Sequence, residues 1–181
     1  MKALSWKTDR RLPDPGMTIV DGPTGFRVRP ATGSDAEAML SLIHSHAAYE
    51  GGEASVSLDA LRSALDPKPA PLVAWVAVQA GGLIGYATVT MDFSTWAGRP
   101  FLHLDCLFVG EGHRSSGIGA ALLNAVRDHA AAFGIPEIQW QTPDWNENAA
   151  RFYLREGASM LPKARFILRT TCGCDRPDRS S

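Results

Sequence analysis

Alternating and continuous runs of apolar residues predict the strands of this chain. Residues 26–29 alternate apolar and basic side chains, whereas residues 101–109 are apolar almost throughout, which is typical of a strand covered on both faces. Residues 72–78 and 85–91 flank a glycine-containing turn at 80–82, and this arrangement indicates a hairpin. The full set of expected strands is 26–29, 72–78, 85–91, 101–109, 137–141 and 164–170.

Apolar residues at helical spacing predict the helices. Ile118, Leu122 and Val126 form one such stripe, which Gly134 and Pro136 end. The expected helices are one through 36–43 that continues until Gly51 and Gly52 end it, and 58–65, 118–133 and 146–156. The resulting order, β-α-α-β-β-β-α-β-α-β, predicts an α/β domain with a mixed sheet. Three consecutive strands argue against a doubly wound dinucleotide-binding fold, in which strands and helices alternate.

Beyond these elements, the chain divides into an extension, one domain and a tail. Residues 1–23 carry several prolines and glycines with little periodicity, as expected of an N-terminal extension. Residues 172–181 are mostly polar and are expected to form a C-terminal tail. The residues between them show no internal repeat and no linker, so 24–171 is expected to fold as one domain.

Composition narrows the function classes. With 45% hydrophobic and 20% charged residues and a formal net charge of −1, the chain has no overall basic field that would recruit nucleic acid or an anionic membrane. Neither a signal peptide nor a membrane-spanning run is present, so a cytoplasmic location is expected. No metal is expected either, because Cys172 and Cys174 lack a second ligand pair and because His44 and His46 lie on different helix faces.

A polar turn between the 101–109 strand and the next helix carries the most specific signal. Arg114, Gly117 and Gly119 stand in R-x-x-G-x-G spacing. Glycines let the backbone approach a ligand, and the free amide hydrogens at a helix start suit a pyrophosphate. The turn lacks the lysine and the Ser/Thr of a Walker loop, and its spacing is not the dinucleotide-binding G-x-G-x-x-G. An ordinary turn without a ligand is the structural alternative.

This spacing resembles the coenzyme A pyrophosphate loop of the GNAT acetyltransferase superfamily. Residues 144–158, DWNENAARFYLREGA, look like that family's N-E-x-A-x-x-F-Y-x-x-x-G-A segment. The W-N-E combination and the stretches 48–50 and 93–96 resemble the spermidine/spermine N-acetyltransferase branch. The likeness covers about residues 25–170. It implies a mostly antiparallel central sheet flanked by helices, acetyl-CoA as cosubstrate and a homodimer.

The resemblance also implies which residues hold the cosubstrate. Backbone groups of Leu107, Phe108 and Val109 would bind the pantetheine arm as an added strand would. Asn146 would bond to the same arm, although it is also a good helix N-cap. The pyrophosphate would be bound by Arg114, Ser115, Ser116, Gly117, Ile118, Gly119 and Ala120. Arg114 has an alternative reading in which it merely solvates the turn.

Tyr153 and Asp105 are the residues expected to transfer protons. In the family, a tyrosine at the position of Tyr153 protonates the departing thiolate, and a phenol with a pKa of about 10 can do so. The alternative for this residue is a core aromatic. Asp105 is expected to accept the proton of the amine. His103 is the reserve base because it is expected to share a face with Asp105 and Leu107, whereas Cys106 is expected to point away from Asp105. The branch usually has two adjacent acids here, so the base stays open between these groups. An aspartate paired inside the sheet is the alternative.

The acceptor is expected to be a small primary amine. The resemblance places Glu50, Glu53, Trp96 and Asp144 near it, although Glu50 and Glu53 could equally be solvated loop acids. The sequence therefore predicts an acetyl-CoA-dependent N-acetyltransferase that works by direct transfer, without an acyl-enzyme. The alternatives are acetylation of a protein or an aminoglycoside, and a non-catalytic acyl-CoA sensor.

Overall fold

The computed structural model describes residues 20–22, 25–66 and 71–168. The chain divides into two compact units, Met1–Pro143 and Asp144–Ser181, which are described separately below. Cys172, Cys174 and most of the expected N-terminal extension lie outside the described residues. The expected boundaries of a single domain at 24–171 stay a prediction.

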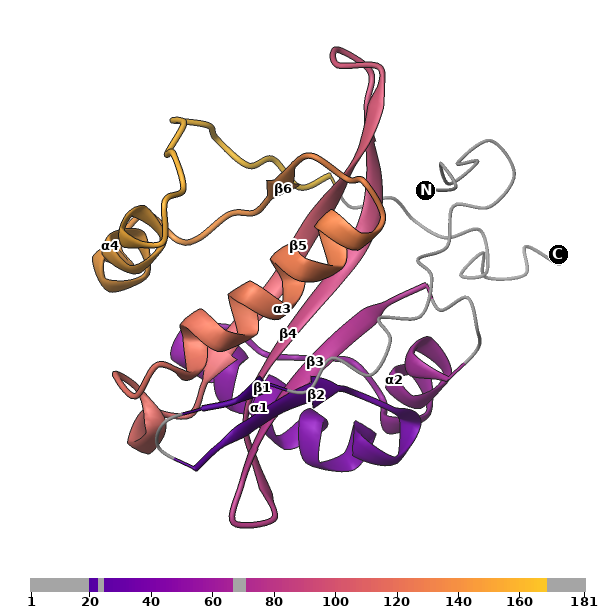
Figure 1. The fold of residues 1–181 in the computed structure, drawn as a ribbon, viewed down its shortest axis with the longest axis vertical. Coiled ribbons are helices and arrows are strands. Elements are labelled where there is room, and N and C mark those ends of the chain that lie inside the picture. The colour runs from indigo at the N-terminus through magenta and orange to yellow at the C-terminus, as the bar shows by residue number, and fades with distance from the viewer. Residues whose placement is uncertain (1–19, 23–24, 67–70, 169–181) are drawn as a thin grey trace, which may run out of the picture. The chain divides into compact units, whose positions relative to one another are not determined.

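In the described part of the first unit, six strands form one sheet in chain order (Figure 1). They are β1 (Val20–Asp21), β2 (Arg27–Pro30), β3 (Val73–Gln79), β4 (Gly82–Ser94), β5 (Arg99–Val109) and β6 (Ile138–Gln139). All neighbouring strands are antiparallel except β5 and β6, which pair in parallel. This arrangement confirms the expected mixed, mostly antiparallel sheet.

Helices pack on both faces of this sheet. α1 (Ala36–Tyr49) and α2 (Leu58–Leu65) share a core with Val76 of β3, Tyr86 of β4 and Phe108 of β5. α3 (Ile118–Ala132) packs on the opposite face, where the ring of His129 meets that of Trp75 edge-on at 5.2 Å between centroids. Neighbouring residues such as Trp75 and Val76 point to opposite faces because side chains alternate along a strand. No helix in the described ranges has both the length and the apolar character needed to cross a membrane.

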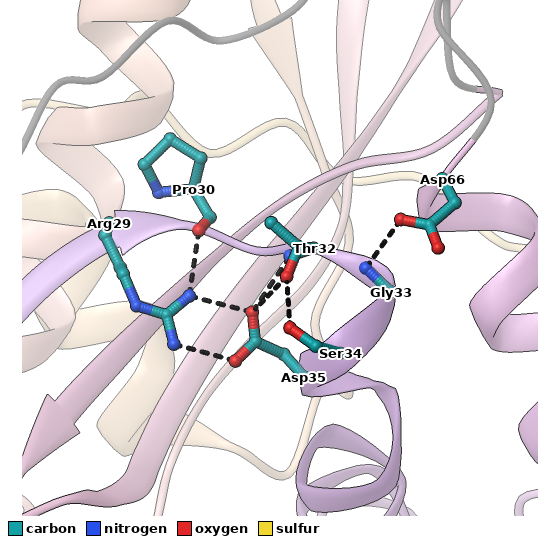
Figure 2. A network of polar contacts seen from close by, with 7 residues as sticks. All are labelled: Arg29, Pro30, Thr32, Gly33, Ser34, Asp35 and Asp66. Carbon is teal, nitrogen blue, oxygen red and sulfur yellow. Dashed lines mark hydrogen bonds and ion pairs between the residues drawn. The ribbon is translucent and has the colours of Figure 1, made fainter.

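A polar network fixes the start of α1 to β2 and α2 (Figure 2). The guanidinium of Arg29 forms two hydrogen bonds of 2.7 Å to the carboxylate of Asp35, which also accepts from the Thr32 amide at 2.9 Å. The amide of Gly33 donates to Asp66 at the end of α2 at 2.8 Å. A Cβ at Gly33 would collide with that carboxylate, so a larger residue there would have to displace the Asp66 side chain. Helix α1, which carries part of the candidate site, is thereby held at its N-terminus.

Two elements differ from the sequence-based expectation. β1 lies within the residues assigned to the extension. α1 ends at Tyr49, just before the two glycines that were expected to end it. The expected last strand at 164–170 is wrong for residues 164–168, which form no strand, and its final two residues lie outside the described ranges. An apolar segment forms a strand only where a neighbouring strand pairs with its backbone. In the second unit, α4 (Glu147–Arg155) is the one regular element among the described residues, so none of those residues provides a partner strand.

Candidate functional site

The turn between β5 and α3 ends in an uncapped helix start. Ser115 and Gly117 adopt left-handed backbone conformations, with φ of 62° and 84°, and Gly117 provides no side chain to cap α3. Among the described residues, no acceptor pairs with the amides of Ile118, Gly119 and Ala120. A Cβ at Gly117 would meet no atom within 4 Å. Unpaired amides at the positive end of a helix dipole, facing open space, are suited to an anion.

The neighbouring strand has a free backbone edge. β5 pairs with β6 at only two positions, Leu102 with Ile138 and His103 with Gln139. Beyond them no described strand covers that edge of β5, which includes the expected cosubstrate-binding residues, Leu107, Phe108 and Val109. A free edge offers amides and carbonyls to an extended ligand.

Asp105 occupies a β-bulge in the middle of β5. Thr88 of β4 lies opposite Cys106, and the next residue, Val89, lies opposite Leu104. Asp105 therefore has no partner in the ladder, and its side chain is exposed. Bulges of this kind redirect side chains and are frequent next to active sites.

The bulge overturns two expectations about the faces of β5. Cys106 does not point away from Asp105, because its Sγ donates to the Asp105 Oδ2 at 3.7 Å. His103 and Leu107, expected to share a face, lie opposite Thr90 and Ala87 of β4. Since residues opposite one another share a face and these two β4 residues are three apart, His103 and Leu107 lie on opposite faces. One inserted residue accounts for both changes.

His46, near the end of α1, lies between Tyr86 and Glu50. Its Nδ1 is 3.0 Å from the Tyr86 Oη, and its Nε2 is 3.4 Å from the Glu50 Oε1. The imidazole stacks on the Phe108 ring with centroids 4.8 Å apart and planes at 20°. The side chain of His46 is 16% exposed, whereas that of Glu50 is 39% exposed. The imidazole is thus mostly buried, and its Nε2 lies near the more exposed glutamate.

Arg114 links the turn to the same end of α1. Its Nε donates to the Val109 carbonyl at 3.1 Å, and its guanidinium carbon lies 4.3 Å from the centroid of the Tyr49 ring. A second aromatic ring, that of Phe108, is 5.6 Å away. Cation–π contacts of this kind hold an arginine in place. The candidate anion-binding turn therefore lies beside the end of α1 that carries His46 and Glu50.

Burial controls the protonation of His46, Tyr86 and Cys106. Burial is the main cause that lowers the pKa of His46; Arg114 lowers it further, while Glu50 and Asp105 partly offset the effect. Burial also raises the pKa of Cys106 to about 11 and raises that of Tyr86 above its usual value. Each shift favours the uncharged form, as expected on removal from water. At neutral pH these three groups are therefore neutral.

Trp96, a predicted acceptor-binding residue, lies away from the bulge at Asp105. Trp96 is fully exposed in the turn of the long β4–β5 hairpin (Figure 1). β5 begins at Arg99, and from there to Asp105 it rises about 20 Å, so Trp96 is remote from the bulge within its own chain. Glu53 lies exposed in the loop after α1.

The remaining predicted residues belong to the second unit. Asn146 caps α4, its Oδ1 accepting from the Ala149 amide at 3.1 Å, which supports the structural reading of this residue. Tyr153 lies on α4 with its ring centroid 5.1 Å from that of Phe152. Asp144 precedes the helix and is exposed. The roles expected for these residues stay predictions.

Sequence reasoning missed His46 and Tyr86 as members of the site. Spacing along the chain raised His46 only as a metal ligand, and Tyr86 only as part of a strand. The contact joins residues that are 40 positions apart, which no local spacing reveals. Three or more His, Cys, Asp or Glu side chains suited to a metal ion do not gather anywhere in the described ranges. The expectation of a reaction without a metal stays an expectation.

Comparison with known proteins identifies relatives. The family model described as "Acetyltransferase (GNAT) family" matches residues 39–158. A thialysine N-epsilon-acetyltransferase from Caenorhabditis elegans is 29% identical over 71% of this chain and 79% of its own length. Another from Bos taurus is 29% identical over 76% of this chain and 86% of its own length. An L-ornithine N5-acetyltransferase from Arabidopsis thaliana is 28% identical over 45% of this chain, which spans only 36% of that relative.

Solved structures share the fold at lower identity. An aminoglycoside acetyltransferase from a soil metagenomic sample has a TM-score of 0.67 and 17% identity, covering 81% of this chain and 97% of that one. A ribosomal-protein-alanine N-acetyltransferase from Brucella melitensis has a TM-score of 0.62 and 18% identity, covering 81% of this chain and all of that one. These likenesses concern the fold, and the acceptors differ between the two enzymes.

Proposed function

The chain belongs to the acetyltransferase (GNAT) family, and from this premise we propose that it transfers the acetyl group of acetyl-CoA directly to a small primary amine. Membership of that family and the named relatives make it an acetyltransferase. The observation that carries the proposal is the contact of Arg114 with Tyr49. Through it, a turn suited to an anion adjoins the end of α1, where Glu50 offers a carboxylate to a cation.

Two features of the first unit support binding of the cosubstrate. The uncapped start of α3, at Ile118, Gly119 and Ala120, suits its pyrophosphate. The free edge of β5 suits its extended arm, whose amides can pair as an added strand does. Acetyl-CoA supplies the activated acetyl group when bound.

The acceptor is a small molecule carrying one amine to be acetylated and, in its favoured form, a second cationic group. Relatives with long alignments are named for thialysine, and one with a shorter alignment for ornithine. Glu50 and the exposed Asp105 provide carboxylates for such cations. A charge-assisted contact of this kind contributes about 1.5–3 kcal/mol, or roughly 10- to 150-fold in affinity.

Tyr153 donates a proton to the departing thiolate in this proposal, and Asp105 attracts the ammonium group. The free amine is required for attack, and an alkylammonium with a pKa of about 10.4 must first lose a proton at neutral pH. The sequence favours Asp105 as the acceptor of that proton.

The proposal is tested by thiol release from acetyl-CoA across a panel of amines. The panel contains a monoamine, a diamine, thialysine, a polyamine, an aminoglycoside and a lysine peptide, compared by kcat/KM at low and moderate salt. We expect one of the small amines to be preferred. A preference above tenfold for the peptide or the aminoglycoside would replace the small-amine proposal. Binding of acetyl-CoA without thiol release from any amine would indicate a sensor.

A further inference from the structure

The side chain of Arg114 is held at one nitrogen and leaves the other two available. Its Nε donates to the Val109 carbonyl at 3.1 Å, and the guanidinium carbon lies 4.3 Å from the centroid of the Tyr49 ring. Within residues 20–22, 25–66 and 71–168, Val109 is the one acceptor of this side chain, and no carboxylate forms an ion pair with it. The terminal nitrogens, Nη1 and Nη2, therefore remain as a pair of donors.

This pair of donors suits an oxyanion. A guanidinium binds a carboxylate through two parallel hydrogen bonds, and Nη1 and Nη2 can form both. The Tyr49 ring lies against the guanidinium, and the Phe108 ring is 5.6 Å away, so the fork is held in place before a ligand arrives. A group that is already ordered loses less conformational entropy on binding.

A carboxylate of the protein lies close to this fork without pairing with it. Glu50 follows Tyr49 at the end of α1, and its Oε1 is 3.4 Å from the Nε2 of His46. The Phe108 ring stacks on His46 at 4.8 Å between centroids, and the same ring lies beside Arg114. A cation and a carboxylate, both on exposed residues, thus lie around one aromatic ring and can each bind the opposite charge of one ligand.

We propose that Arg114 binds the carboxylate of an α-amino acid acceptor, whose α-ammonium group faces Glu50 and whose side-chain amine is acetylated. The proposal rests on the proposed amine acetyltransferase function. The carboxylate and the ammonium group of an α-amino acid are bonded to the same carbon, so they require a cation and an anion close together. Asp105, exposed in β5, remains for the side-chain ammonium. Arg114 then disfavours a polyamine, which carries positive charges alone.

The pyrophosphate of the cosubstrate is the other oxyanion that could occupy the fork. The amides suited to it belong to the start of α3, at Ile118, Gly119 and Ala120. The guanidinium instead lies against a ring of α1, next to the residue that precedes Glu50. A carboxylate beside the fork favours a ligand that also carries a positive charge, which a pyrophosphate lacks. The structure therefore favours the carboxylate of the acceptor.

The first experiment uses acceptors that differ only in the carboxylate. Thialysine is compared with bis(2-aminoethyl) sulfide, and ornithine with 1,4-diaminobutane, by thiol release from acetyl-CoA. We expect the parent chain to prefer the amino acid of at least one pair by about tenfold or more in kcat/KM. In Arg114→Gln this preference should be lost, mainly through a higher KM for the amino acid. Arg114→Lys keeps the charge without the fork, so we expect an intermediate preference.

Two further variants separate this role from a general effect of charge. Arg62→Gln removes the same charge from α2, where Arg62 lies 3.6 Å from Asp59 and is about half exposed, and it should keep the parental preference. Tyr49→Leu removes the ring against the guanidinium and should weaken the preference. Calorimetry should show acetyl-CoA affinity largely unchanged in Arg114→Gln. Equal losses for both members of a pair, with weaker acetyl-CoA binding, would assign Arg114 to the pyrophosphate and overturn the proposal.

The second experiment measures acceptor binding without turnover. Thialysine and bis(2-aminoethyl) sulfide are titrated into the chain saturated with coenzyme A, which has no acetyl group to transfer. We expect thialysine to bind more tightly to the parent chain and to lose this advantage in Arg114→Gln. If this difference is present but no amine releases thiol, the proposed function fails while the carboxylate site is supported. If amines release thiol but neither amino acid is preferred, the carboxylate site is wrong and the proposed function stands.

Discussion

Burial, rather than direct charge pairing, decides the state of the side chains beneath α1. His46, Tyr86 and Cys106 are all shifted toward their neutral forms, and in each case loss of water is the largest cause. The carboxylates of Glu50 and Asp105 lie in more exposed positions. The buried part of the site is therefore polar but uncharged at neutral pH.

Removal of the Tyr153 hydroxyl should distinguish a structural role of this residue from a catalytic one. Tyr153→Phe keeps the ring that packs near Phe152 and removes only the hydroxyl. If that hydroxyl protonates the departing thiolate, we expect kcat to fall about 10²-fold or more while acetyl-CoA affinity is preserved. Thiol-release kinetics and calorimetry measure the two quantities. Turnover of the variant at the parental rate would exclude this role.

At the scale of elements, the turn between β5 and α3 depends on one backbone conformation. Gly117 has φ of 84°, and a side chain there would enter the open space in front of the helix start. We expect Gly117→Val to raise the acetyl-CoA dissociation constant at least about tenfold, because the bulk occupies the place expected for the pyrophosphate. Calorimetry on the folded variant provides the measurement.

Gly134, at the end of α3, provides the matched control. It also has a left-handed conformation, with φ of 65°, and a Cβ at this position would meet no atom within 4 Å. Gly134→Val therefore carries similar backbone strain without approaching the turn. Equal affinity losses in the two variants would mean that strain, and not the loss of a binding surface, explains the effect.

The junction of β2 with α1 should contribute to stability in a pH-dependent way. Arg29 and hydrogen bonding hold the pKa of Asp35 below its usual value, so the contribution is present above about pH 3.9 and is lost as the pH falls through the lowered pKa. We expect Asp35→Asn to lose about 1.5–3 kcal/mol of unfolding free energy at pH 7 and less at pH 3. Urea unfolding at both pH values measures this difference.

The exposed pair Arg27 and Asp21 is the control for that experiment. Its atoms are 2.8 Å apart, similar to the Asp35 contacts, but both side chains are more than half exposed. We expect Asp21→Asn to cost at most about 1 kcal/mol. A loss in Asp35→Asn no larger than in this control would show that the buried network does not fix α1.

On the scale of the whole molecule, local patterns predicted most elements and few of the contacts between them. The helix at 58–65 and the hairpin near 80–82 depend on neighbouring residues, and both were predicted. The bulge at Asp105 was missed because apolar periodicity does not show where a ladder skips a residue. The contact of His46 with Tyr86 was missed because it forms only after α1 packs on the sheet.

The bulge at Asp105 also bears on how such a chain can evolve. Because the extra residue has no ladder partner, losing it would restore regular pairing without breaking a strand. The residues on either side of the deletion would keep their β4 partners and therefore their faces, so only the exposed side chain of Asp105 would be lost. Insertions and deletions at this one position can therefore add or remove a single side chain at the candidate site on an unchanged sheet.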